Sequence, residues 1–190
     1  MQLRSFALVA CCTLLAAATP LQTIAQGGGV KMDGAQPSAK PIASPPATAE
    51  VSLNGKQVVI HYNSPLLKGR AIGTAIVPFG QVWRTGANAA TTLITPTNLK
   101  IGTLSVPAGT YTIYTLPGAS QWLLIVNKQT GQWGTEYSEA QDLGRTPMTS
   151  ETLPASQENM FISFENTQGA NTQLHIKWAT TDEYVNVQAQ

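Results

Sequence analysis

Hydrophobic and polar residues alternate with a period of two along most of the second part of the chain. In residues 56–63, the apolar side chains of Val58, Ile60 and Tyr62 share one face, and His61 falls on the other. This period matches an extended strand, whose successive side chains point to opposite faces of a sheet. Further strand-like segments are residues 111–115, 122–126 and 174–178. The pattern therefore predicts a chain built mainly of β-strands.

Turn signals separate these segments at short intervals. They include Asn54-Gly55, Pro117-Gly118 and Gln168-Gly169. The pattern predicts one short helical turn, near residues 138–143, and no longer amphipathic helix. About eight or nine strands at this spacing are typical of a sandwich. The predicted fold class is all-β, a single antiparallel β-sandwich over residues 50–190, with a jelly roll as one variant of it.

The first part of the chain has a different composition. Residues 1–25 have the layout of a secretory signal peptide, with Arg4 before an apolar run at residues 5–18 and small residues up to Ala25. Residues 26–49 are rich in Gly, Pro and Ala and have no hydrophobic period, which predicts a flexible linker. We therefore expect an exported protein, periplasmic or extracellular.

Both cysteines of the chain lie in the predicted signal peptide. Residues 8–11 (LVAC) resemble a bacterial lipobox, so lipidation at Cys11 is an alternative to cleavage near Ala25. Contact with a membrane is expected only in that case. Cleavage near Ala25 is favoured, because the apolar run continues past Cys11, and it would leave no thiol for a disulfide or a metal.

The charge balance of the predicted domain excludes some partners. Residues 50–190 contain eight Lys and Arg against nine Asp and Glu, without a basic run, which argues against a nucleic-acid partner. His61 and His175 are the two histidines and lie far apart in the sequence, without the spacing of a zinc site. No metal and no cofactor is predicted.

Three arginines are the first candidates for a binding site. Arg70, Arg84 and Arg145 are the arginines of residues 50–190, and each stands in a turn-rich context or beside Gly. Their planar guanidinium groups are suited to a carboxylate or phosphate of a ligand. The alternative is that they hold loop carbonyls or pair with Asp and Glu. Asn88 would bind a ligand hydroxyl or amide, or close an Asx turn.

Histidine and tryptophan supply the remaining candidates. His61 is a candidate for ligand binding, as a general base or a metal ligand, and the alternative is a strand histidine that bonds to a neighbour or faces solvent. Trp133 lies in a Gly-rich turn, where we expect it to be exposed and suited to stacking on a sugar ring. Trp122 and Trp178 fit inward strand positions and are expected in the core. His175 is expected on a polar, exposed face.

Four segments resemble a known bacterial family, the domain of unknown function 2911. They are residues 62–65 (YNSP), 68–70 (KGR), 77–91 (VPFGQVWRTGANAAT) and 108–111 (AGTY). The resemblance spans essentially all of residues 50–187, and Phe79 stands where Tyr is common. It implies an exported bacterial protein, and it supplies no established activity, substrate or catalytic residue.

Three functions are compatible with these residues. The first is non-catalytic binding of a small molecule, a glycan or a protein partner. The second is a hydrolase-type enzyme that uses His61 with Arg84 or Asp142, and the third is a structural module of the cell envelope. The surroundings of the Arg84 guanidinium discriminate among them: a fully paired group would serve folding, and a group facing an open cleft would serve binding.

Overall fold

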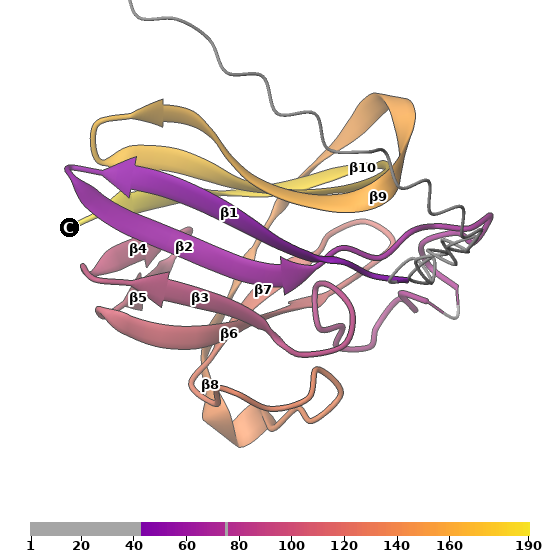
Figure 1. The fold of residues 1–190 in the computed structure, drawn as a ribbon, viewed down its shortest axis with the longest axis horizontal. Coiled ribbons are helices and arrows are strands. Elements are labelled where there is room, and N and C mark those ends of the chain that lie inside the picture. Colours follow the sequence, from indigo (N-terminus) through magenta and orange to yellow (C-terminus); the bar gives the residue numbers. More distant parts are fainter. Residues whose placement is uncertain (1–42, 75) are drawn as a thin grey trace, which may run out of the picture. The chain divides into compact units, whose positions relative to one another are not determined.

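A computed structural model describes residues 43–74 and 76–190, which form two antiparallel sheets in a sandwich-like arrangement (Figure 1). The all-β prediction is confirmed. The predicted signal peptide, Cys11 and most of the predicted linker lie outside the described residues. In the part of the chain that is described, no helix is long and apolar enough to cross a membrane.

The larger sheet has the strand order β1-β2-β3-β6-β7-β8. Its neighbours are consecutive in the sequence except between β3 and β6, where the chain enters the second sheet. The strands are β1 (Pro46–Leu53), β2 (Lys56–Asn63), β3 (Thr91–Thr95), β6 (Gly109–Leu116), β7 (Leu123–Asn127) and β8 (Asp142–Pro147). A 3-10 turn, η1 (Glu139–Gln141), precedes β8 where a helical turn was predicted.

The second sheet has the strand order β5-β4-β10-β9. Its strands are β4 (Leu99–Ile101), β5 (Leu104–Val106), β9 (Thr149–Gln168) and β10 (Asn171–Ala189). The two long strands β9 and β10 are antiparallel and are joined by a turn at Gly169, with a φ of 58°. That left-handed conformation is one that glycine adopts without steric penalty.

The first hairpin shows how the local sequence sets the register. Asn54 and Gly55 join β1 to β2 and have φ angles of 49° and 75°. Two consecutive left-handed residues make the tight hairpin turn that an Asn-Gly pair favours. Because β1 begins at Pro46, the boundary expected at Glu50 lies inside this strand.

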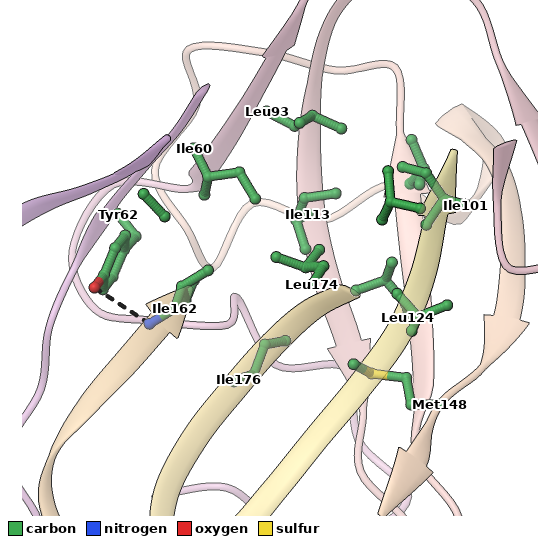
Figure 2. Packing of buried hydrophobic residues seen from close by; sticks show 14 of the residues in the cluster. Ile60, Tyr62, Leu93, Ile101, Ile113, Leu124, Met148, Ile162, Leu174 and Ile176 are labelled. Carbon is green, nitrogen blue, oxygen red and sulfur yellow. Dashed lines mark hydrogen bonds between the residues drawn. The ribbon is translucent and has the colours of Figure 1, made fainter. Parts of the chain in front are cut away.

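The core lies between the two sheets and is filled by the inward faces that the period of two predicted (Figure 2). Ile60 and Ile113 from the larger sheet pack in one cluster with Leu174 and Ile176 from β10, and all four are at most 3% exposed. The Tyr62 hydroxyl also crosses between the sheets, where it accepts a hydrogen bond from the backbone N–H of Ile162 at 3.2 Å. Its apolar ring is thus buried with its polar group satisfied.

β10 folds back on itself near Ala179. The side chains of Gln173 and Asn186 share a 3.2 Å hydrogen bond, although residues 13 apart in a straight strand would be separated by about 40 Å. Ala179 has a φ of 53°, and the register of β10 with β9 shifts on both sides of it. Both limbs of β10 therefore take part in the second sheet, a reversal that the sequence analysis did not predict.

This reversal explains why the expectation for His175 was wrong. The side chain is 5% exposed, not exposed, because the returning limb places Asp182 and Tyr184 beside it. Its Nδ1 lies 2.9 Å from the Asp182 carboxylate, and its ring stacks on Tyr184 with centroids 4.9 Å apart. The alternation along a strand predicts on which side of the sheet a side chain lies, but it does not predict which other segment of the chain packs over that side.

Candidate functional site

The segment around Arg84 is held to the larger sheet by its backbone. Trp83 and Thr115 exchange two backbone hydrogen bonds of 2.8 and 2.9 Å. Farther along, the N–H of Ala87 donates to the Asn63 carbonyl at 3.2 Å, at the end of β2. These bonds fix the position of the backbone from which the Arg84 side chain projects.

Two residues of this segment have an unusual backbone. Thr85 has a φ of 51° and Asn88 a φ of 60°. Asn tolerates the left-handed region, but a β-branched Thr rarely adopts it. Thr85 is fully buried, and its carbonyl accepts a 2.9 Å hydrogen bond from the Thr91 hydroxyl. Such strain is retained only where the surrounding structure enforces it, and it is common at binding sites.

A cavity of about 550 Å³ opens beside this segment. Three of the predicted candidates, Arg70, Arg84 and Asn88, line it together. His61, Trp133 and Arg145 are not among its lining residues. We call this space the Arg84 cavity. Its other polar lining residues are Ser44, Gln81, Tyr114, Thr135 and Tyr137.

The Arg84 guanidinium is not neutralised by the fold. Its Nε is buried and has no hydrogen-bond partner, and within residues 43–74 and 76–190 no carboxylate forms an ion pair with it. A buried donor without a partner is unfavourable by about 1–3 kcal/mol, and more when it is charged.

Gly134 brings a second loop against Arg84. Its backbone N–H donates to the Asn88 carbonyl at 3.0 Å. A Cβ at this position would stand 2.7 Å from the same carbonyl oxygen and would also meet the Arg84 stem. Only glycine therefore allows this close approach, which positions the arginine.

Arg70 contributes a second positive charge to the cavity. Its Nε and Nη2 donate to the carbonyls of Leu67 and Leu66, at 2.9 and 2.7 Å. Carbonyl oxygens orient the guanidinium without cancelling its charge. Two guanidinium groups without a carboxylate partner among the described residues therefore face one cavity.

One part of the cavity lining is aromatic. The rings of Trp83 and Trp178 are stacked, with centroids 5.7 Å apart and an interplanar angle of 12°. Trp178 is anchored by its indole N–H, which donates to the Glu158 carbonyl at 3.0 Å. The cavity lining thus includes two largely buried indole side chains and two arginines.

Arg145, the third predicted arginine, lies in a separate network. Its Nε donates to Asp142 at 3.0 Å, and its Nη2 forms a 2.7 Å ion pair with Glu139. Tyr137 also belongs to this network, since its hydroxyl donates to Asp142 at 2.7 Å and accepts from Arg145 at 2.9 Å. Burial and then the bond to the Asp142 carboxylate raise the pKa of Tyr137 to about 12.

The remaining candidates lie apart from Arg84. His61 is exposed, and its Nδ1 lies 3.2 Å from the Thr48 hydroxyl of the neighbouring strand. Trp133 is 52% exposed, as expected, but projects outside the cavity lining. Ser64 donates to the Met160 carbonyl at 2.7 Å, and Asp142 is held by Arg145 and Tyr137. No hydrogen bond within the described residues joins His61 to either residue that the hydrolase hypothesis requires.

Sequence reasoning missed several cavity residues, notably Trp178, Tyr137 and Gly134. Trp178 was assigned to the core, and it is indeed 3% exposed while still lining the cavity. Gly134 was noted only as part of the turn that presents Trp133. The glycines in that turn are a local signal of a tight backbone, but the contact of Gly134 with Asn88 depends on tertiary structure.

The comparisons with known proteins agree with the resemblance of the four segments. Neither the curated proteins nor the solved structures give a significant match to the chain. One family model, described as "Protein of unknown function (DUF2911)", matches residues 44–187, which cover both sheets except the last two residues of β10 and include every residue of the Arg84 cavity. The chain therefore belongs to the DUF2911 family.

Proposed function

We propose that this domain binds a small organic anion in the Arg84 cavity and does not catalyse a reaction on it. The observation that carries this proposal is that the guanidinium groups of Arg84 and Arg70 line one cavity without a carboxylate partner among the described residues. A carboxylate or phosphate in the cavity would accept charge-assisted hydrogen bonds from the Arg84 guanidinium. Arg70 adds a second fixed charge on the same cavity.

The cavity also favours a particular shape of anion. Trp83 and Trp178 line the cavity while 8% and 3% exposed, so they add a small apolar area beside the charges. A ligand with one anionic group and a planar or apolar body would use both features. Its volume of about 550 Å³ is in the range of small-molecule sites.

Binding without catalysis is favoured over a hydrolase because the described residues that line the cavity include no His, Asp or Glu. His61 lies outside the cavity lining, and the Asp142 carboxylate is already engaged by Arg145 and Tyr137. General acid–base catalysis needs a titratable group within hydrogen-bonding reach of the substrate. The tyrosines that line the cavity, Tyr114 and Tyr137, both have a raised pKa, primarily through burial, and so remain protonated at neutral pH.

Calorimetric titration with benzoate tests the proposal, and the neutral benzamide serves as a matched probe. We expect benzoate to bind and benzamide to bind at least tenfold more weakly. Arg84→Gln should weaken benzoate binding about 10- to 100-fold, since a charge-assisted hydrogen bond contributes about 1.5–3 kcal/mol. Lys128→Gln removes the same charge from an exposed site outside the cavity and should leave the affinity unchanged.

Equal affinity of the wild-type protein and the Arg84→Gln variant for benzoate would refute the assignment of the cavity. Inorganic phosphate and citrate extend the series to smaller and more highly charged anions. If none of the three anions bound, anion binding would be rejected and the structural role in the envelope would gain support.

A further inference from the structure

A second cavity, lined in part by the loop that follows Arg70, contains a buried acid. Glu183 of β10 lies opposite Ser150 of β9 and is 2% exposed. The Ser150 hydroxyl donates to its Oε2 at 2.7 Å. Within the described ranges no Lys, Arg or His forms an ion pair with this carboxyl. A buried carboxylate without a counter-charge is strongly unfavourable, so it takes up a proton or acquires a cation.

Near neutral pH, the protonated and the ionised forms of the Glu183 carboxyl are both populated. Burial raises its pKa most, the Ser150 hydrogen bond opposes that rise, and the negative charge of Asp182 adds to it, giving a pKa of about 7. Asp182 itself faces the opposite side of β10, where it bonds to His175 and Lys177. Glu151 of β9 is the other charged group that lines the cavity.

The cavity next to Glu183 has a volume of about 210 Å³. Its apolar walls are Phe79, Trp122 and Ile72, from two loops that contribute no titratable group to the lining. Trp122 is fixed by an edge contact with Trp83, with centroids 6.2 Å apart and an interplanar angle of 88°. Phe79 is 46% exposed.

Gly73 fixes the second aromatic wall. A Cβ on Gly73 would stand 2.6 Å from the Phe79 ring, so the ring packs directly against the glycine backbone. The residue also has a φ of 85°, which other residues rarely adopt. The partly exposed Phe79 ring is therefore held at the cavity by its contact with the chain and is not a freely rotating surface group.

We propose that this cavity binds a small organic ammonium ion, with the Glu183 carboxylate as its counter-ion and Trp122 and Phe79 as aromatic walls. Aromatic faces attract cations, most strongly when the cation is desolvated. An inorganic divalent ion is disfavoured, because the described residues contain no group of three or more His, Cys, Asp or Glu side chains. This site is independent of the anion proposed for the Arg84 cavity.

The test is an NMR titration of the ¹⁵N-labelled full chain with tetramethylammonium chloride, and sodium chloride at equal ionic strength is the reference. The Trp122 indole N–H reports on the cavity and is assigned with the Trp122→Phe variant. We expect saturating shifts with an affinity on the order of millimolar at pH 8. Binding should be about tenfold weaker at pH 6, where a proton occupies a carboxyl with a pKa of about 7.

Two variants separate the charge from the aromatic wall. Glu183→Gln keeps the shape and the Ser150 contact and should abolish binding, whereas Glu50→Gln, on an exposed strand position, should leave it unchanged. If Glu183→Gln does not fold, Phe79→Leu provides the test, with an expected loss of affinity of about three- to tenfold. The proposal is overturned if no saturating shift occurs, if sodium gives the same shifts, or if the affinity is the same at pH 6 and pH 8.

Discussion

Arg84 and Arg145 are the same residue type in one domain, and the fold uses them in opposite ways. Arg145 pairs with Asp142 and Glu139 and also donates to Tyr137. Arg84 has a buried Nε without a partner among the described residues, and it faces a cavity of about 550 Å³. The backbone beside Arg84 is held by hydrogen bonds from Trp83 to Thr115 and from Ala87 to Asn63, whereas its guanidinium forms no ion pair among the described residues.

The contrast shows how a folding arginine differs from a binding arginine. A guanidinium that serves folding is surrounded by acceptors, because removing it from water is favourable only when its donors are satisfied. A guanidinium that serves binding is held by its stem and lines a cavity without a carboxylate partner. Gly134 provides this support at Arg84, since its close approach fixes the stem without offering an acceptor to the Nε.

The largest effect on stability and on benzoate affinity is expected from Gly134→Ala, because it disrupts the close packing of Gly134 against the Arg84 side chain. The new methyl group would stand 2.7 Å from the Asn88 carbonyl oxygen, so one of the two loops must move. We expect the free energy of unfolding to fall by about 3 kcal/mol. Benzoate affinity should fall at least tenfold. Urea denaturation and calorimetry measure the two effects.

Thr130→Ala is the control for this prediction, since it changes an exposed position of the same loop. It should alter the free energy of unfolding by less than about 0.5 kcal/mol. An unchanged stability of the Gly134→Ala variant would show that the close approach does not define the cavity.

A pair of matched substitutions should separate the roles of the two arginines. Arg145→Gln leaves the Asp142 carboxylate, whose side chain is 11% exposed, without its cation. We expect a loss of about 2 kcal/mol in the free energy of unfolding, less than for a fully buried pair because Arg145 is 31% exposed. Arg84→Gln should not lower it and should raise it by about 1 kcal/mol, because it loses no hydrogen bond and removes a buried charged donor that has no partner among the described residues. If urea denaturation showed that both substitutions destabilise the fold equally, the proposed difference between a folding role for Arg145 and a binding role for Arg84 would be rejected.

The smallest effect is expected at Tyr137, which belongs to both regions. Its ring lines the Arg84 cavity, while its hydroxyl bonds to Asp142 and Arg145. Tyr137→Phe should lower the free energy of unfolding by about 1 kcal/mol, the contribution of the lost hydrogen bonds. Benzoate affinity should change less than about twofold if Arg84 and Arg70 hold the anion. If calorimetry showed that Tyr137→Phe lowers benzoate affinity more than tenfold, the anion would bind closer to the Arg145 network than we propose.

Several features of the fold could be predicted from short stretches of sequence. The buried and exposed faces of β2 followed from the alternation at Val58, Ile60 and His61, because strand side chains alternate strictly. The Asn54-Gly55 turn was equally local, since both residues adopt left-handed backbone at little cost. Trp133 was correctly expected to be exposed from its Gly-rich turn.

The site was predictable only in part. Arg70, Arg84 and Asn88 were named as candidates from their Gly-rich context, and they line one cavity. His61 and Arg145 were named on the same kind of argument and lie outside its lining. Residue type and neighbouring glycines indicate that a side chain is available for binding. They do not indicate which other segment will lie next to it.

The period of the apolar positions and the turn residues were enough to establish an all-β sandwich, because these depend on interactions between residues close in sequence. The environment of each charged group was set by contacts between distant segments. The reversal at Ala179 buried His175 against Asp182, and the approach of Gly134 shaped the surroundings of Arg84. A charged side chain has the same local sequence signal whether it is paired or not, so its role depends on which partners the packing of the sheets brings within reach.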